Sequence, residues 1–276
     1  MTTQAVPMQS VFDILSNSRT IELGNRLEDG MPVSPSHPGF KMGLIRRHGD
    51  KVGADGVSGS NELIVTGGHV GSHIDALCHA AHDGVMFGGV DAADAVKGGK
   101  YTQLGVETIE PFVCRGVLAD IPRALGVARL EPGFGVTPDH IDAALGGVTP
   151  GEGEVVLVRT GWPQLYHDPT AYIGHATGVP GITAESATYL ADMGVRAVCS
   201  DTVATDQLLA GAGHGSLPAH RVLLIDRGVH IIEILNFEEL SASEHKEFLF
   251  ICLPLRITGA TGSPVRPVAV VPEIAG

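Results

Sequence analysis

Aromatic residues, basic residues and long apolar runs are all scarce in this chain. Aromatics make up 5% of the 276 residues, while 37 glycines and 17 prolines indicate many tight turns rather than a helical bundle. Lysine and arginine number 18 against 31 acidic residues, so no basic surface for nucleic acid is expected. No apolar run approaches the length of a membrane span, so no membrane partner is expected either.

Cysteines are also few. Cys78, Cys114, Cys199 and Cys252 form no Cys-x-x-Cys pair, so reduced, buried thiols are expected rather than a zinc site built from them. The first 17 residues lack the basic start and apolar core of a signal peptide, which favours a cytoplasmic location. The length suits one large domain over 1–276, with about 1–19 as an N-terminal extension.

Strand and helix patterns alternate in the second half of the chain, which predicts an α/β fold with a mixed sheet. The apolar run within 153–160 is typical of a buried strand. Thr137 and Thr183 are N-cap signals for two helices, and Gly194 and Gly228 are stop signals. Further strands are expected over 20–23, 63–66, 113–119, 195–199, 229–235, 248–257 and 267–271, helices before residue 17 and over 218–227, and loops over 29–40 and 162–180.

The densest group of possible metal ligands lies in 67–84, which holds four of the 13 histidines. Even steps of four, two and four residues separate His69, His73, Asp75 and His79, so an extended segment would place all four side chains on one face. A helix would turn Asp75 roughly 200° away from His73. Histidines interleaved with a carboxylate are typical of a divalent metal site, so an extended metal-binding segment is predicted.

Three ligands from His69, His73 and Asp75 would leave positions open for water and substrate. A bound divalent ion lowers the pKa of a water toward neutrality and polarises a carbonyl, and His79 on the same face would carry the proton. The alternatives are a hydrogen-bonded loop cluster for the first three residues, and a fourth ligand or an orienting group for His79.

Other motifs along the chain support a family resemblance. The His-x-x-x-His-x-Asp-x-x-x-His pattern of 69–79 resembles the signature of the metal-dependent cyclase superfamily, which includes bacterial kynurenine formamidases and isatin hydrolases. Other segments resemble further motifs of the family and occur in the family's order, so the resemblance extends from about residue 20 to the end. These segments are 21–23 with 30–32, 159–162, Asp201 with Asp206, 220–224 with Glu233, and 259–266.

The resemblance implies a compact swivelling β/β/α-type fold and assembly into homodimers or homotetramers. It also implies metal ligation by His69, His73 and Asp75, with His79 as the catalytic acid or base. The chain is longer than a typical bacterial formamidase near its N-terminus and around 125–180, which favours the isatin-hydrolase-like branch.

The same resemblance leaves two metal arrangements open. In two-zinc formamidases a downstream His and Glu also bind metal, and these positions match His220 and Glu233. In isatin hydrolases one manganese is bound and a glutamine assists, for which Gln207 is the candidate. Mn²⁺ is therefore favoured, with Zn²⁺ as the alternative.

The remaining candidates each have a structural alternative. Glu233 lies in an apolar strand, so it needs a buried partner unless it faces outward. Asp201 is a site candidate or a turn residue. The candidate pocket residues are His82, which could be structural; Phe87 and Trp162, which could stack on an aromatic substrate or pack in the core; and His214 and Ser216, which could cover the pocket or form a surface loop.

These observations predict a metal-dependent hydrolase that cleaves a C–N amide bond of a small, aromatic, cyclic amide. The most specific expectation is hydrolysis of isatin to isatinate. The alternatives are an arylformamidase acting on N-formylkynurenine, a hydrolase of another lactone or cyclic imide, and a metal-stabilised binding protein without turnover.

Overall fold

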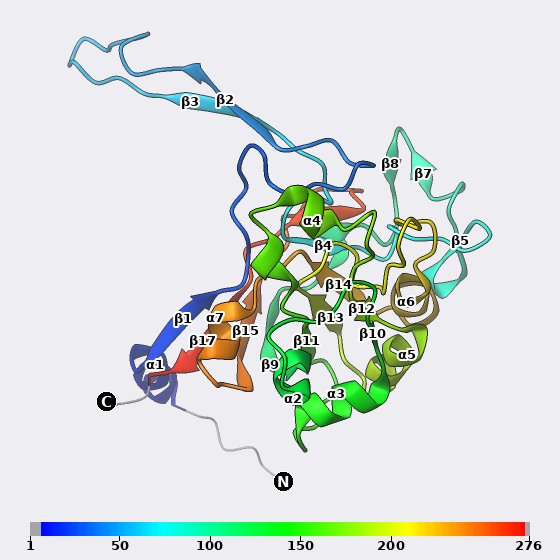
Figure 1. The fold of residues 1–276 in the computed structure, drawn as a ribbon. Coiled ribbons are helices and arrows are strands. Elements are labelled where there is room, and N and C mark those ends of the chain that lie inside the picture. The colour runs from blue at the N-terminus through cyan, green and yellow to red at the C-terminus, as the bar shows by residue number, and fades with distance from the viewer. Residues whose placement is uncertain (1–6, 274–276) are drawn as a thin grey trace.

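The computed structural model describes residues 7–273, and its main feature is one mixed sheet (Figure 1). Its strand order is β1-β17-β15-β9-β11-β13-β14-β4-β16, with the central β9, β11, β13 and β14 parallel. This sheet, with helices packed on it, confirms the predicted α/β fold. The strands are β1 (Ser18–Glu22), β4 (His73–Asp75), β9 (Phe112–Asp120), β11 (Val155–Arg159), β13 (Ala197–Ser200), β14 (His230–Glu233), β15 (Glu247–Cys252), β16 (Gly262–Pro264) and β17 (Val268–Pro272).

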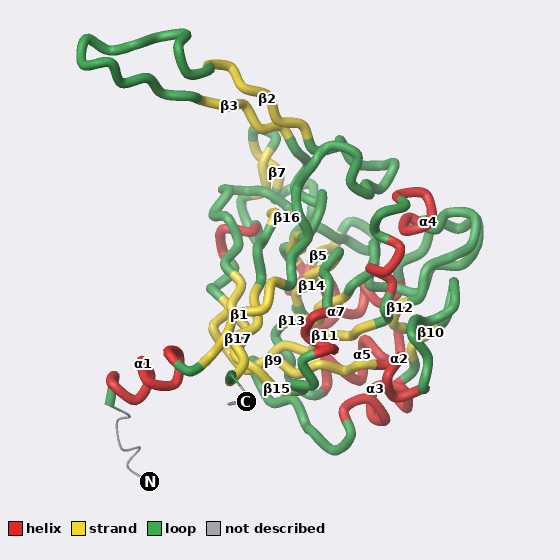
Figure 2. Tube along the Cα trace, turned by 60° about the vertical axis from the view of Figure 1, so that its left-hand side comes forward, coloured by secondary structure: helices red, strands yellow, loops and turns green. Residues whose placement is uncertain are grey.

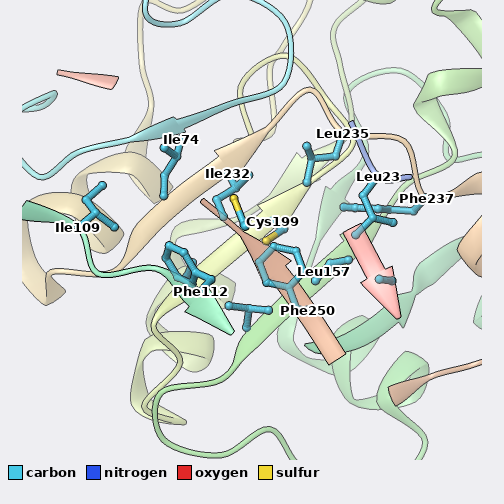
Figure 3. Packing of buried hydrophobic residues seen from close by; sticks show 14 of the residues in the cluster. Leu23, Ile74, Ile109, Phe112, Leu157, Cys199, Ile232, Leu235, Phe237 and Phe250 are labelled. Atoms are coloured by element: carbon cyan, nitrogen blue, oxygen red, sulfur yellow. The ribbon is translucent and has the colours of Figure 1, made fainter. Parts of the chain in front are cut away.

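Both faces of the central strands are buried, which explains why β11 is a continuous apolar run. Leu157 and Ile232 face one cluster, which also contains Phe250 (Figure 3). Val156 and Ile231 face the other, which is covered by α3 (Pro138–Leu145), α5 (Ala184–Asp192), α6 (Pro218–His220) and the π-helical segment η4 (Arg221–Arg227).

The expected helix signals are confirmed. Thr137 forms a capping box at the start of α3, and the Thr183 hydroxyl accepts a hydrogen bond from the Ser186 N–H at 3.2 Å. Gly194 and Gly228 follow their helices with φ of +80° and +68°, a conformation that glycine adopts without a steric penalty.

Several expected boundaries are wrong. The strand expected over 229–235 ends at Glu233, because Ile234 adopts φ of +58° and turns the chain. The strand expected over 248–257 ends at Cys252, shortly before Pro254, whose nitrogen has no hydrogen to donate to a sheet. The expected loop over 162–180 contains two short helices, η3 (Trp162–Leu165) and α4 (Pro169–Ile173).

Smaller elements surround the sheet. Helix α1 (Met8–Ser16) lies beside β1 and β17 and has no buried residue. The others are β5 (Val85–Met86), η1 (Phe87–Gly89), β6 (Val90–Asp91), β7 (Val96–Lys97), β8 (Lys100–Tyr101), η2 (Val106–Thr108), α2 (Ile121–Leu125), β10 (Gly135–Val136), β12 (Gly181–Ile182) and α7 (Glu238–Ala242). Among residues 7–273, no helix combines the length and the apolar character that crossing a membrane requires.

One hairpin leaves the body of the molecule. β2 (Lys41–Arg46) and β3 (Asn61–Val65) pair antiparallel and project away from the sheet, as both views show (Figures 1 and 2). The strand expected over 63–66 thus exists, but it lies in this projection, and every residue of both strands is exposed.

Replacing Phe250 by alanine should lower the free energy of unfolding by about 3–5 kcal/mol, because the ring is fully buried in the cluster of Figure 3. Val113→Ala, on the adjacent strand but 63% exposed, should change it by less than about 0.5 kcal/mol. Urea unfolding of both variants measures the difference, and equal losses would show that this cluster does not stabilise the sheet as described.

Candidate metal centre

The candidate ligands meet where β14 ends beside the start of β4. These two strands are antiparallel, and Glu233, the last residue of β14, pairs with His73, the first residue of β4. The carboxyl ends of parallel strands are the usual ligand-binding edge of α/β sheets. The sheet topology therefore brings a glutamate and a histidine together that are far apart in the sequence.

The conformation of 69–79 differs from the expectation. Only residues 73–75 are extended, because Gly71 turns the chain with φ of +67° and the His79 N–H donates to the Ala76 carbonyl at 2.9 Å. The extended conformation predicted for the whole segment is therefore wrong outside 73–75. The turns nevertheless bring the rings of His69 and His79 together, with their centroids 3.9 Å apart.

Asp75 lies at the centre of the cluster and is fully buried. Its Oδ1 lies 2.7 Å from His69 Nδ1 and 3.5 Å from His73 Nε2, and its Oδ2 lies 3.5 Å from His220 Nε2. Within residues 7–273, Oδ2 has no hydrogen-bond donor. A buried carboxylate oxygen without a partner is costly, and a cation would satisfy it.

Two overlapping donor sets can hold a metal ion. His69, His73 and Asp75 form one and Asp75, His79 and His220 the other, with the ligand atoms of each set within 4.8 Å of one another. Imidazole nitrogens with one carboxylate suit zinc, manganese or iron. The residues therefore fit a divalent ion, and Asp75 belongs to both sets.

His220 is oriented by a carboxylate that was not among the candidate ligands. Its Nδ1 lies 2.6 Å from Asp206 Oδ2, and the Asp206 carboxylate also accepts the backbone N–H groups of Ala219 and His220. This leaves Nε2 directed at Asp75, a pattern typical of metal-binding histidines. Asp206 was visible in the sequence only as part of the family-like Asp201/Asp206 loop.

Glu233 faces the cluster and not the solvent. Its Oε1 lies 3.4 Å from His73 Nε2, and its Oε2 accepts a hydrogen bond from the Thr205 hydroxyl at 3.1 Å. Thr205 has φ of +55°, which is strained for a β-branched residue. Because Thr205 precedes Asp206, one strained turn positions both Glu233 and His220. No sequence pattern marked Thr205 in advance.

The histidines of the cluster differ in their pKa values. Burial lowers the pKa of His79 to about 4, although Asp75 opposes this effect. Burial alone would also lower the pKa of His73, but hydrogen bonds to Asp75 and Glu233 outweigh it and raise the pKa to about 10. Within residues 7–273, the ring nitrogens of His79 make no hydrogen bond to protein, so the neutral ring can accept a proton.

Two weaker candidates lie outside the cluster. Gln207, the candidate for the assisting glutamine, donates through its amide to the Gly133 carbonyl at 2.7 Å and is not among the described residues that line the hollow. Asp201 accepts hydrogen bonds from the backbone N–H groups of Thr160 and Gly161 and from the Thr160 hydroxyl, and burial raises its pKa to about 7. Asp201 therefore ties β13 to the end of β11.

Of the candidate pocket residues, some line the hollow at the cluster and others lie elsewhere. His82 lies beside Asp83, Phe87 packs against Gly228, and the Trp162 indole is buried and donates to the Tyr172 carbonyl at 2.7 Å. Among the described residues that line the hollow at the candidate ligands, none of these three is found, nor is Ser216. His214 does line it. His37, which was not predicted, also lines it and stacks on His69 at 5.6 Å.

The hollow at the cluster adjoins a larger cavity. The hollow holds about 40 Å³ and the cavity about 280 Å³, and both are lined by Ser34 and His214. Ile173, Leu208 and Leu209 also line the cavity, and no Lys, Arg, Asp or Glu does. This cavity is near the lower end of small-ligand pockets, about 300–1,000 Å³. The cavity therefore offers a mostly apolar space that adjoins the hollow at the candidate ligands.

Comparisons with known proteins find similar sequences and a similar fold. The model of the Cyclase family matches residues 21–207. Isatin hydrolase of Roseibium aggregatum is 29% identical over 216 residues, 76% of this chain and 74% of that protein. Kynurenine formamidase of Delftia acidovorans is 30% identical over 200 residues, 72% and 75% of the two chains. A solved structure described as a novel cyclase superposes with a TM-score of 0.85 at 25% identity, covering 97% of this chain and 92% of that one.

Asp75→Asn should abolish stable binding of Mn²⁺ and Zn²⁺, because both donor sets lose their shared carboxylate. Asp206→Asn should keep the ligands but weaken metal affinity about 10–100-fold, because it removes the charge that orients His220. Elemental analysis after dialysis against graded metal concentrations measures both effects.

The control is His82→Ala, which removes a histidine outside the cluster and should leave the metal content unchanged. Full metal content in Asp75→Asn would rule out the site as described.

Proposed function

Because this chain belongs to the Cyclase family, we propose that it is a metal-dependent hydrolase of a small cyclic amide, with isatin as the leading substrate. The observation that carries the proposal is the buried Asp75 oxygen that has no donor within residues 7–273, set among histidines whose hollow adjoins a mostly apolar cavity. A purely structural metal site has no need of an open cavity beside it or of an imidazole with free ring nitrogens.

His69, His73 and Asp75 would hold the ion, and His220 and Glu233 would complete its surroundings or hold a second one. We favour Mn²⁺, with Zn²⁺ as the alternative. When bound, a divalent ion activates water and polarises the substrate carbonyl. Thr261, whose hydroxyl lies 2.9 Å from His69 Nε2, would fix the orientation of the first ligand ring.

His79 is the residue placed to move the proton. It lies beside Asp75 and against the ring of His69, and it lines the hollow. Its free ring nitrogens would take a proton from the attacking water and deliver it to the departing amide nitrogen, which must be protonated to leave. His214, on the wall shared by the two cavities, would contact the substrate and not the ion.

The wall chemistry favours a neutral substrate over N-formylkynurenine. That amino acid carries an ammonium and a carboxylate, and burying either without an opposite charge is costly. Among the described residues, no Lys, Arg, Asp or Glu lines the 280 Å³ cavity to receive them, and its mostly apolar wall, which also includes His175 and His214, suits a small uncharged ring. Phe87 and Trp162 pack elsewhere, so stacking on these two rings is not part of the proposal.

The proposal is tested by stripping the protein with chelator, restoring Mn²⁺ or Zn²⁺ and adding isatin. Loss of the visible absorbance of the dione, dependent on metal, is the expected result. No reaction with isatin, but deformylation of N-formylkynurenine, would transfer the proposal to the formamidase activity. If only another lactone or imide is hydrolysed, the proposal that the protein is a hydrolase stands but its substrate changes. If none of these compounds is turned over, the proposed function is wrong.

His79→Ala should lower kcat by about 10²–10⁴-fold, because it removes a positioned proton carrier, while the bound metal stays near the wild-type amount. Steady-state kinetics and elemental analysis on the same preparation separate the two effects. Unchanged turnover would refute the role of His79, and loss of the metal together with activity would identify it as a ligand.

A further inference from the structure

Ile234 adopts a backbone conformation that is unfavourable for its residue type. Among the described residues, five residues other than glycine have positive φ, and Ile234 (φ +58°) and Thr205 (φ +55°) are the two β-branched ones. A β-branched side chain clashes with the backbone in this region, so the conformation persists only where the surroundings enforce it. Both residues adjoin the candidate ligand Glu233: Thr205 bonds its carboxylate, and Ile234 follows it in the chain.

Two side chains hold the Ile234 carbonyl. The Ser72 hydroxyl donates to it at 2.7 Å, and the Asn25 side-chain amide donates to it at 2.8 Å. The Ser72 hydroxyl also accepts the backbone N–H of Asn25 at 2.8 Å, so the three residues form a closed ring of hydrogen bonds. We refer to Asn25, Ser72 and Ile234 as the clamp. Because Ser72 and Ile234 are 2% and 3% exposed, water has little access to these bonds.

The clamp joins two candidate ligands that come from neighbouring strands. Ser72 directly precedes His73 at the start of β4, and Ile234 directly follows Glu233 at the end of β14. His73 and Glu233 are the last pair of the ladder between these strands, and His73 Nε2 lies 3.4 Å from Glu233 Oε1. Just beyond this pair, the Ser72 side chain bonds the Ile234 backbone. The clamp therefore ties the two strands together immediately next to the two ligands.

The unusual conformation lets two consecutive side chains face the same space. Glu233 and Ile234 both line the hollow, whereas consecutive side chains of a continuing strand point to opposite faces. Ile234 also packs with Trp162 and Leu208, and Leu208 lines the adjoining cavity. A glycine would make the turn without a steric penalty, but it would remove the apolar side chain from this wall.

We propose that Asn25 and Ser72 are positioning residues of the metal centre, which hold Ile234 so that His73 and Glu233 keep their separation. Without donors on its carbonyl, Ile234 would relax toward negative φ, and the Glu233 carboxylate would move with the backbone. A ligand displaced by more than about 0.2 Å from its coordination distance binds an ion more weakly. This role rests on the metal centre of the proposed function but not on its substrate.

The test is the affinity of Ser72→Ala for Mn²⁺ and for Zn²⁺, measured by dialysis of stripped protein against graded metal concentrations. The variant should bind both ions about 10–100-fold more weakly, the usual loss when a hydrogen bond that orients a ligand is removed. Asn25→Leu removes the second donor at similar side-chain size and should weaken binding in the same direction. It also provides an independent measurement if Ser72→Ala does not fold.

Ser186→Ala is the matched control. Ser186 is also buried, and its hydroxyl donates to the Val136 carbonyl at 2.6 Å in the cluster on the helical side of the sheet. Both serine variants should lower the urea midpoint of unfolding, but Ser186→Ala should keep the wild-type affinity for both ions. Wild-type affinity in Ser72→Ala and Asn25→Leu would overturn the proposal, and so would an equal loss of affinity in Ser186→Ala, because the effect would then be one of stability alone.

The strain at residue 234 is tested on the metal-free protein by comparing Ile234→Gly with Ile234→Ala. Both remove the side chain, but only glycine adopts φ of +58° without strain, so the glycine variant should have the higher urea midpoint. A higher midpoint for alanine, the usual order within a strand, would overturn the proposal. A wild type that binds neither ion would overturn the proposed function as well, whereas wild-type binding that both clamp variants retain would overturn the positioning role alone.

Discussion

The candidate site depends on one buried carboxylate. Asp75 contacts His69 and His73 through one oxygen and faces His220 with the other, so every proposed ligand side chain except Glu233 is arranged around it. Its charge has no Lys or Arg beside it in the described residues and is balanced by imidazoles alone. An arrangement of this kind is stable when a cation completes it, because a buried charge needs an opposite charge.

The sheet fixes the positions of the side chains around Asp75. β14 and β4 carry Glu233 and His73 side by side, and both strands lie in a sheet whose two faces are packed. The strained turn at Thr205 and Asp206 then orients Glu233 and His220 from outside the cluster. The strands hold the candidate ligands His73, Asp75 and Glu233, and hydrogen bonds with Thr205 and Asp206 set the directions of Glu233 and His220.

The hollow at the cluster and the cavity beside it have different linings. Histidines make up half of the described residues that line the hollow, whereas the adjoining cavity is mostly apolar and is lined by no Lys, Arg, Asp or Glu among the described residues. The chain leads from Ser34 and His37 into the β2–β3 hairpin and returns to the hollow at His69. Residues on both sides of this hairpin therefore line the hollow, together with His214, His220 and Glu233 from later segments.

The sequence by itself determined the family, the positions of the core strands and the first candidate donor set, because these are local patterns: apolar runs, N-cap residues, and a histidine motif whose members lie within eleven residues. It also marked His220 and Glu233, but only through the resemblance. It named Asp206 only as part of a family-like loop, gave no sign of Thr205 or His37, and could not show that Trp162, Phe87 and Gln207 do not line the hollow described within residues 7–273. These placements depend on contacts between segments distant in the sequence. Only the tertiary structure decides which side chains converge, since the pairing of β14 with β4 and the turns on either side of β4 set their directions.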